Sequence, residues 1–240
     1  MAAPGHALLS ADYDNLEVRV LAYEMGDPVL IAQLERGENI HDLNTQVLFG
    51  VNKDDKNWSN LRAAAKIWQF GRNQYGGGDR KIYEQIIAKS PGVHLTFADF
   101  KEATRKWEQR YSAYRPWRNA LECRIREHRK VTDAFGRTRQ LLGSERDIVK
   151  EGINHVIQAP AAHIKNQALI AIDDWLEAHA PTSRLVLDIH DEIILEIPIC
   201  DLKIVRAKVK SIMEAPTQFR NRKVSFPVST HAGKNWAELK

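Results

Sequence analysis

LVLDIHDEIILEI, residues 185–197, is the stretch that decides the fold. Its two halves, residues 185–189 and 193–197, are apolar and rich in β-branched side chains, which predicts two short strands. His190, Asp191 and Glu192 form the bend between them. Burying a carboxylate costs free energy unless a cation compensates it, and Mg²⁺ binds carboxylate oxygens. The ordinary alternative is a solvated hairpin tip, because most turns are polar.

A second short strand delivers another acid. Residues 7–11 are apolar and lead directly into Asp12. An aspartate after a strand is usually a turn residue or a helix cap. Two strands that lie far apart in sequence and each end in an aspartate are also what a two-metal phosphoryl-transfer site requires. Asp12 and Asp191 are therefore the candidate metal ligands.

Three stretches, in order along the chain, resemble the polymerase motifs of one family. SADYDNLEVR (residues 10–19), RAAAKIWQFGRNQYGGG (62–78) and VLDIHDEIILEI (186–197) resemble the motifs of family A DNA polymerases, the bacterial polymerase I type. The tail HAGKNW (231–236) resembles the end of that family as well. The resemblance covers essentially the whole chain. It implies an α+β fold: a palm with an antiparallel sheet and helices, and an α-helical fingers subdomain.

The resemblance also implies a division of the chain and a reaction. Residues 1–18 and 131–240 would form the palm, and residues 19–130 the fingers. The reaction would be template-directed DNA synthesis, in which dNTPs are added to a primer 3′-hydroxyl with two Mg²⁺ ions, Mn²⁺ being able to substitute. Asp12, Asp191 and the backbone carbonyl of Tyr13 would be the metal ligands, and Glu192 a supporting acid.

Residues 61–71 read as a strong helix with three alanines. Arg62, Lys66 and Phe70 are spaced by four and share one face of it. The residues alone leave two readings equal: a face that binds a nucleoside triphosphate, or a solvated basic stripe with Phe70 in the core. The resemblance implies that Arg62 and Lys66 bind phosphate oxygens and that Phe70 lies against the sugar and base. Lys66 would also protonate the leaving pyrophosphate.

Two more residues gain a nucleotide-binding role from the resemblance. Glu17 lies in the first turn of a predicted helix, where the helix dipole favours an acid in any case. In the family the equivalent glutamate crowds the sugar 2′-position and excludes ribonucleotides. His41 is expected in a loop, where a histidine is commonly just solvated; the resemblance implies that it contacts the incoming phosphates.

The second motif departs from the family pattern at one point. The family usually has a tyrosine four residues after the phenylalanine, but here that position is Gln74 and the tyrosine is Tyr75. Either the helix end holds one extra residue or Gln74 occupies the tyrosine's place. We assign stacking at the template base to Tyr75, and a hinge to the glycines that follow it.

DNA contacts are expected from the second half of the chain. Lys150, Asn154 and Gln158 are spaced by four in a long helix, and their ordinary role would be hydrogen bonds within the protein. The resemblance implies that this face reads the minor groove of the new duplex, where acceptor positions are similar for all base pairs. It also implies a phosphate contact for Arg137, in a hairpin around residues 135–137, and a primer-end contact for His190.

The remaining pattern predicts connecting elements. A long helix should begin after Thr96 and be broken or kinked at Pro116. A last strand, residues 224–230, should lie at a sheet edge or bulge because it contains Pro227.

Composition sets broad limits. The 240 residues are 43% hydrophobic and 28% charged, enough for one globular unit or two small ones. The net charge of +4 is compatible with a polyanionic partner such as a DNA template–primer. No apolar run approaches the roughly 20 residues of a membrane span, and the N-terminus lacks the pattern of a signal peptide. Cys123 and Cys200 form no spaced motif, so free thiols in the cytoplasm are expected, in the host cytoplasm if the protein is phage-encoded.

The family usually carries a thumb, further palm strands and often an exonuclease before the first motif, whereas Asp12 lies near the start of this sequence. We therefore expect a phage-like split polymerase whose N-terminal half is a separate polypeptide docked on an unpaired sheet edge. A truncated polymerase and a short stand-alone enzyme remain open. So does a catalytically silent DNA- or subunit-binding module, although intact Asp12, Lys66 and Asp191 argue against it. A related RNA polymerase is disfavoured by Glu17.

Overall fold

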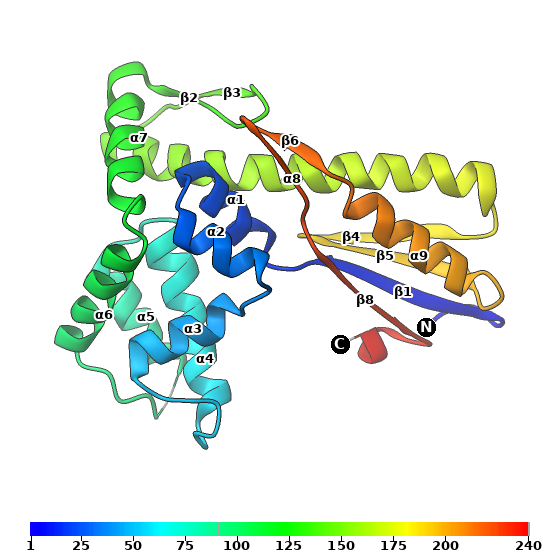
Figure 1. Cartoon of the computed structure of the whole chain (residues 1–240), viewed down its shortest axis with the longest axis horizontal. Coiled ribbons are helices and arrows are strands. Elements are labelled where there is room, and N and C mark those ends of the chain that lie inside the picture. Colours follow the sequence, from blue (N-terminus) through cyan, green and yellow to red (C-terminus); the bar gives the residue numbers. More distant parts are fainter. Residues whose placement is uncertain (91, 240) are drawn as a thin grey trace. The chain divides into compact units, whose positions relative to one another are not determined.

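The computed structural model describes residues 1–90 and 92–239 and divides into two compact units. The sheet unit consists of Met1–Val20, Asp133–Arg137 and Ile157–Lys240. The helical unit consists of Leu21–Thr132 and Thr138–Val156. The chain passes from one unit to the other inside helices α1 (Leu16–Met25) and α8 (Glu145–His179) and at the β2–β3 hairpin (Figure 1).

A four-stranded antiparallel sheet is the centre of the sheet unit. Its strands are β4 (Arg184–Ile189), β5 (Glu192–Pro198), β1 (His6–Tyr13) and β8 (Val228–Gly233), in that spatial order. The predicted strand before Asp12 and the predicted hairpin around Asp191 are both confirmed. β1 is buried on both faces over residues 7–11 and exposes Asp12 near its end, and Leu9, Ala11 and Tyr13 on one face are almost fully buried. Helix α9 (Leu202–Met213) packs against β1, β5 and β8.

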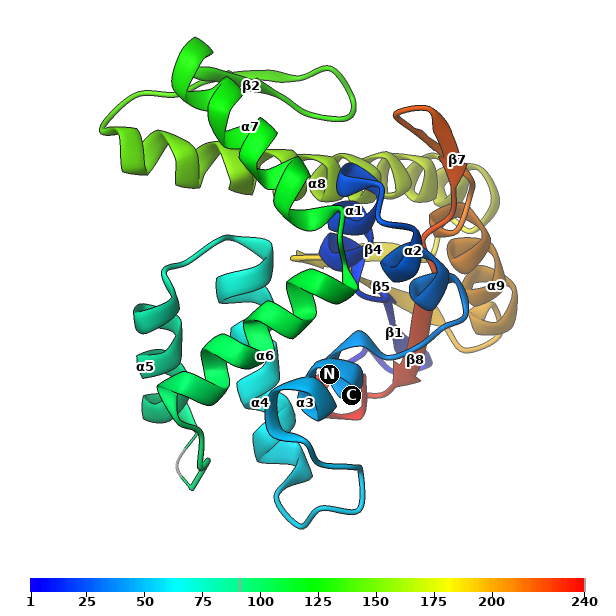
Figure 2. The same cartoon turned by 60° about the vertical axis from the view of Figure 1, so that its left-hand side comes forward.

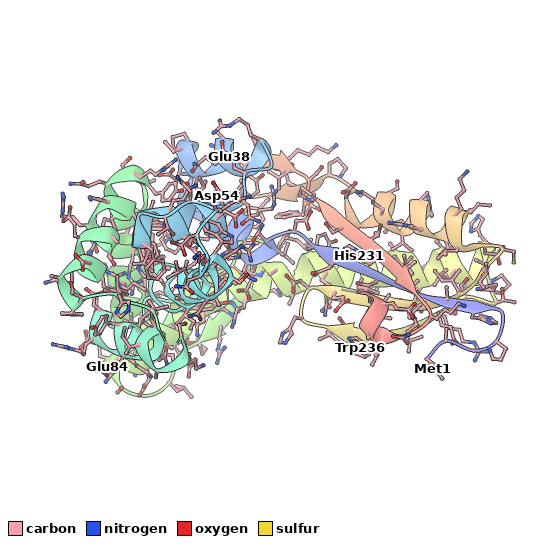
Figure 3. The ribbon with its side chains drawn as sticks, turned by 90° about the horizontal axis from the view of Figure 1, so that it is seen from below. Met1, Glu38, Asp54, Glu84, His231 and Trp236 are labelled. Atoms are coloured by element: carbon pink, nitrogen blue, oxygen red, sulfur yellow. The ribbon has the colours of Figure 1, made fainter. Side chains whose placement is uncertain are left out.

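The two chain ends meet beside this sheet. The N–H of Ala2 donates to the carbonyl of Lys234 at 2.8 Å, and Figures 1 and 2 both place the termini side by side. The final 3₁₀ helix, Trp236–Leu239, brings Leu239 onto Leu8 and Ile194. Figure 3 shows Trp236 in this helix, beyond His231 on β8. The C-terminal segment therefore closes one end of the sheet face opposite α9.

The last strand is shorter than predicted. Instead of one strand over residues 224–230, a hairpin of β6 (Thr217–Phe219) and β7 (Arg222–Val224) is followed by a separate β8. Pro227 falls in the gap between β7 and β8. Proline has no N–H to give to a ladder, so the chain leaves one sheet before it and joins the other after it.

The helical unit contains most of the helices. They are α2 (Pro28–Glu35), α3 (Ile40–Phe49), α4 (Trp58–Trp68), the π-helical segment η1 (Gln69–Gln74), α5 (Asp79–Lys89), α6 (Phe97–Arg110) and α7 (Tyr114–His128), with the short strands β2 (Lys130–Thr132) and β3 (Thr138–Gln140). Large side chains fill its core: Trp68, Phe100, Trp107 and Tyr114 are 0–1% exposed. Thr96 and Asp99 form a capping box that starts α6, as the sequence predicts.

The predicted break at Pro116 lies elsewhere. α6 already ends at Arg110 and α7 begins at Tyr114, so Pro116 sits inside the first turn of α7. A proline is tolerated there because the first N–H groups of a helix have no partner within the helix. The interruption falls at residues 111–113, where Asp27 accepts a hydrogen bond of 3.1 Å from the N–H of Ala113.

The compact units differ from the predicted division by two residues at each boundary, 19–20 and 131–132, and in one longer stretch. Residues 138–156, which the sequence assigned to the palm together with the rest of 131–240, cluster with the helices. Two ion pairs tie the start of α8 to its neighbours there, Arg126–Glu145 at 2.7 Å and Arg139–Glu151 at 3.0 Å. The palm and fingers division itself stays a prediction. Across the described residues, the structure has no helix that is both long and apolar enough to span a membrane.

Candidate active site

Strand pairing brings three acids together at one end of the sheet. Asp12 is directly opposite Glu192 in the β1–β5 ladder, so both side chains lie on the same face. Asp191 precedes Glu192, and its backbone carbonyl accepts a hydrogen bond of 3.3 Å from the N–H of Tyr13. Residues 180 positions apart in sequence thus form one carboxylate cluster, as the sequence predicts.

The cluster crowds carboxylates together at a partly buried place. The pKa of Asp12 is raised to about 6, first by burial and then by the negative charges of Asp191 and Glu192. Burial also raises the pKa of Asp191. The side chain of Asp12 is nevertheless open to solvent. Carboxylates that are crowded, partly desolvated and still accessible favour a bound cation.

These donors fit Mg²⁺. Among the residues that the structure describes, no set of three or more His, Cys, Asp or Glu side chains is arranged to hold a metal ion. Mg²⁺ is commonly held by one or two carboxylates together with substrate phosphates and water, and seldom by an all-protein cage. Asp12 and Asp191 supply such a carboxylate pair.

Two serines that the sequence prediction missed orient neighbouring acids. The hydroxyl of Ser10 donates to Glu192 at 2.5 Å, and that of Ser229 donates to Asp14 at 2.8 Å. Ser10 lies two residues before Asp12 on β1, and this period-two spacing places it on the same sheet face. That spacing was a visible indication of its role. Ser229 pairs with Asp12 only through the fold, so the sequence offered no comparable indication.

The bend itself has an unusual backbone. Ile189 and Glu192 are paired, which leaves His190 and Asp191 as a two-residue turn. His190 has a φ of 53°, a left-handed conformation that glycine adopts far more readily. Such strained positions are concentrated at functional sites. The exposed His190 therefore adopts an energetically costly geometry directly beside the carboxylates.

The predicted cationic face lies in the helical unit. Lys66 is exposed, whereas Arg62 and Phe70 are half-buried. The guanidinium of Arg62 is already engaged, since its Nε donates to Asp42 at 2.6 Å. The ring of Phe70 lies 5.5 Å from the ring of His41, centroid to centroid. Arg62, Lys66 and Phe70 therefore share one side of α4 and η1, and the buried His41 lies beside Phe70.

His41 corrects the expectation of a loop residue. It lies in the first turn of α3 and is only 6% exposed. Its pKa is lowered to about 4, first by burial and then by the positive charges of Lys66 and Arg62. The imidazole is consequently neutral near pH 7, so a contact with phosphate would be a neutral hydrogen bond.

The extra residue after Phe70 is absorbed by a π-helical turn. α4 gives way to η1, and the N–H of Tyr75 bonds to the carbonyl of Phe70, five residues back, at 3.0 Å. Gln74 is fully buried, whereas Tyr75 lines a cavity. Of the two alternatives left open by the sequence, the structure thus has the helix end with one extra residue.

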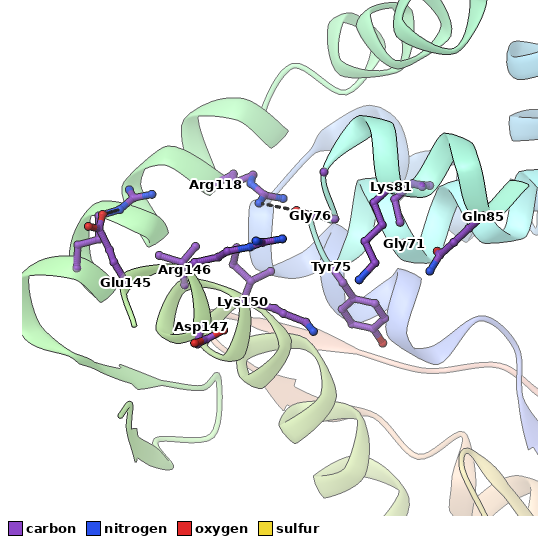
Figure 4. Close-up of a pocket in the computed structure, with 16 residues that line it drawn as sticks. Gly71, Tyr75, Gly76, Lys81, Gln85, Arg118, Glu145, Arg146, Asp147 and Lys150 are labelled. Atoms are coloured by element: carbon purple, nitrogen blue, oxygen red, sulfur yellow. Dashed lines mark hydrogen bonds and ion pairs between the residues drawn. The ribbon is translucent and has the colours of Figure 1, made fainter. Parts of the chain in front are cut away.

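The cavity beside Tyr75 has a volume of about 720 Å³ and lies within the helical unit. Figure 4 shows Tyr75, Lys81 and Lys150 directed into it. Its walls are rich in cations, with two acids among them: Lys81, Arg118, Arg126, Arg146 and Lys150 against Glu145 and Asp147. Arg118 reaches the carbonyl of Gly76 at 3.5 Å, and any side chain at Gly76 would collide with its guanidinium.

The expected DNA-contact residues differ in their surroundings. Lys150 lines the cavity, Asn154 is half-buried and Gln158 is exposed on α8. Arg137 makes hydrogen bonds within the protein, to Asp133 at 3.1 Å and to the carbonyl of Ala159 at 2.5 Å. Its guanidinium therefore fastens the β2–β3 hairpin tip to α8, and a phosphate contact by Arg137 stays a prediction. Glu17 is half-buried in the first turn of α1.

Comparison of the sequence with models of known protein families identifies one match. The model of DNA polymerase family A matches residues 1–238. The chain belongs to DNA polymerase family A. The family resemblance and the α+β fold predicted from the sequence are thereby confirmed.

Relatives of this family A chain are longer proteins. It is 31% identical to DNA polymerase I of Lactococcus lactis subsp. lactis over 243 residues, which cover 97% of the chain and 26% of that relative. It is 31% identical to DNA polymerase I of Chloroflexus aurantiacus over 251 residues, 100% of the chain and 25% of that relative. The chain thus spans about a quarter of the length of the curated relatives it matches.

The fold of the family A chain also resembles a solved structure. The POL domain of Pol1 from M. smegmatis, in complex with DNA primer-template and dNTP, aligns with a TM-score of 0.84 at 22% identity. The alignment covers 99% of this chain and 41% of that one. At this identity the likeness describes the fold alone.

Proposed function

We propose that this chain performs template-directed DNA synthesis, adding dNTPs to a primer 3′-hydroxyl by two-metal-ion nucleotidyl transfer. The observation that carries the proposal is the cluster of Asp12, Asp191 and Glu192, in which crowded carboxylates lie around the solvent-exposed Asp12. Membership of DNA polymerase family A supports the same reaction.

In this proposal Asp12 and Asp191 hold two Mg²⁺ ions, with the backbone carbonyl of Tyr13 as a further ligand. Bound there, the ions would lower the pKa of the primer 3′-hydroxyl and neutralise charge on the triphosphate. Glu192, held by the hydroxyl of Ser10, acts as the supporting acid. His190 lies at the exposed turn and contacts the primer end.

The helical unit supplies the groups that bind the nucleotide. Arg62 and Lys66 bind phosphate oxygens through charge-assisted hydrogen bonds. Neutral His41 adds a hydrogen bond, and the ring of Phe70 packs against the sugar and base. Lys66 is exposed and can hold a transferable proton, so it protonates the leaving pyrophosphate. Glu17 excludes ribonucleotides by crowding the 2′-position.

DNA is the second substrate of the proposed reaction. Tyr75 stacks at the template base, and the cations that line its cavity attract the template backbone. Lys150, Asn154 and Gln158 follow the minor groove of the new duplex, and Arg137 contributes near its backbone. A net charge of +4 suits this partner.

We further propose that a separate N-terminal polypeptide completes the enzyme by docking on strand β4. β4 and β8 are the two outer strands of the sheet in the described part of the chain, and Val186 and Leu187 of β4 are 47% and 39% exposed. An unpaired strand edge with exposed apolar side chains is a ready template for another strand. If the chain and the candidate polypeptide elute as two separate species, with and without DNA, this docking proposal is wrong.

Templated incorporation of a single nucleotide tests the proposed reaction. The wild-type chain, with the N-terminal polypeptide added in a parallel series, should incorporate only the dNTP complementary to the template base. Lys66→Ala should slow incorporation by about 10²-fold or more, because it removes a general acid and a phosphate ligand. Lys101→Ala, at an exposed lysine of α6, is the matched control and should have no effect. Incorporation that ignores the template base would contradict the proposal.

A further inference from the structure

Arg118 of α7 is a largely buried cation whose hydrogen bonds all lie within the helical unit. Its side chain is only 13% exposed. The Nε donates to Glu122 at 2.8 Å, and Nη1 donates to the hydroxyl of the fully buried Tyr114 at 3.0 Å. Nη2 reaches the carbonyl oxygen of Gly76 at 3.5 Å, the contact that Figure 4 marks. Because three partners surround the planar guanidinium, its orientation is fixed.

The guanidinium of Arg118 covers the backbone of Gly76. A methyl group on Gly76 would lie 2.0 Å from both terminal nitrogens of Arg118, far inside any allowed contact. Gly76 also has a φ of 65°, a left-handed conformation that glycine adopts without steric cost. The chain therefore turns at Gly76 directly under the arginine.

The other side of this turn is held by η1. The N–H groups of Tyr75 and Gly77 donate to carbonyls within η1, at 3.0 and 2.7 Å. These bonds use the donors of the turn, whereas Arg118 contacts the carbonyl of Gly76. Tyr75 and Arg118 line the same cavity. The peptide that follows Tyr75 is therefore held between η1 and α7.

We propose that Arg118 is a positioning residue: by holding the carbonyl of Gly76, it fixes the peptide after Tyr75 and thereby the direction of the Tyr75 ring at the cavity. The inference deepens the proposed function and rests on it, because it takes Tyr75 as the residue that stacks at the template base. A ring held in one place favours a template base in the correctly paired position, so loss of the contact should reduce discrimination between nucleotides.

Hydrogen–deuterium exchange of the full 240-residue chain tests the hold on the turn without an activity assay. In Arg118→Met, the amides of residues 71–78 should exchange about tenfold faster than in the wild type, because the turn opens more often. Arg118→Lys keeps the charge but not the planar group, so its exchange should also be faster. Arg124→Met, at an exposed arginine of α7, is the matched control and should exchange like the wild type.

Single-nucleotide incorporation tests the role at the template base. The ratio of correct to mismatched incorporation should fall about tenfold in Arg118→Met, the scale of one lost hydrogen bond, and to a similar extent in Tyr75→Ala. The double variant should lose at most about threefold beyond Tyr75→Ala, because Arg118 acts through Tyr75. If the two losses multiply, or if Arg118→Met slows correct and mismatched incorporation equally, the role of Arg118 is purely structural and the inference is wrong.

The two measurements separate failure of the inference from failure of the proposed function. Faster exchange in Arg118→Met, beside a folded wild type that incorporates no nucleotide, would support the hold on the turn and overturn the proposed function. Unchanged exchange in Arg118→Met, beside templated incorporation by the wild type, would overturn the inference alone. Arg118→Lys replaces Arg118→Met in both measurements if circular dichroism shows that the methionine variant does not fold.

Discussion

The raised pKa of Asp12 makes the stability of the folded protein depend on pH. Its pKa is about 6 in the folded protein against an ordinary value of 3.8, so folded Asp12 keeps its proton to a higher pH than unfolded Asp12 does. The free energy of unfolding must therefore fall as pH rises through this interval. A divalent cation bound at the proposed metal site would offset this cost, because it would bind only the ionised carboxylates.

Asp12→Asn should remove this loss of stability. Without divalent ions, we expect the variant to exceed the wild type by about 1 kcal/mol at pH 7.5, a figure reduced from the full linkage value because the side chain is open to solvent. Near pH 3.5 both forms are uncharged at this position, and the difference should disappear. Urea unfolding at the two pH values measures this. An equal gain at both values would mean that charge crowding is not the cause.

Glu17 is the residue to which we assign the proposed discrimination between deoxyribose and ribose. It is half-buried in the first turn of α1, a place that helix electrostatics alone would also favour. If it crowds the 2′-position, Glu17→Ala should raise incorporation of rNTPs relative to dNTPs by about 10²-fold, a scale typical of discrimination by one hydroxyl group. Paired single-nucleotide assays with both substrates decide the point. No gain in rNTP use would remove the sugar-gate assignment.

At the scale of elements, the π-helical segment η1 explains how this chain accommodates its extra residue. Asn73 is fully buried there, and among the described residues neither polar atom of its side-chain amide has a hydrogen-bond partner. A buried amide in that state costs about 1–3 kcal/mol, and an apolar group of similar shape avoids the cost. The turn thus has a cost in stability and places Tyr75 at the cavity.

Asn73→Leu should accordingly stabilise the protein, by about 1 kcal/mol. The measurement is the urea midpoint of unfolding, with the slope checked for constancy. Asn60→Leu, in the first part of α4, is a comparison at a neighbouring helical position. A loss of stability in Asn73→Leu would show that the amide is hydrogen-bonded in solution and that η1 is not strained in this way.

The elements also show what the sequence could and could not predict. The strands beside Asp12 and Asp191 follow from apolar β-branched runs, and the face of Arg62, Lys66 and Phe70 follows from four-residue spacing. Burial of His41 could not be predicted, because it depends on α3 packing in the helical unit and no local pattern signals it. The contact of Arg118 with Gly76 depends on tertiary structure in the same way. The predicted break at Pro116 was wrong because a proline breaks the interior of a helix but is tolerated in its first turn.

At the scale of the whole molecule, the two compact units carry different parts of the proposed chemistry. The sheet unit holds the carboxylate cluster and the turn at His190. The helical unit holds the predicted cationic face of Arg62, Lys66 and Phe70 and the cavity beside Tyr75. The chain spans about a quarter of the relatives it matches, so the activity of those longer proteins remains a proposal for it. The exposed edge of β4 makes the effect of an added N-terminal polypeptide the relevant comparison in any assay.

Primer extension with Mg²⁺ and all four dNTPs tests the central claim most directly. It is run with the wild-type chain, Asp191→Ala and Asp174→Ala, the last at an exposed aspartate of α8 in the same unit, each with and without the N-terminal polypeptide. The account predicts extension by the wild type and by Asp174→Ala in at least one series, and none by Asp191→Ala. Extension that survives Asp191→Ala, or no extension in either series by a folded wild-type chain, would contradict it.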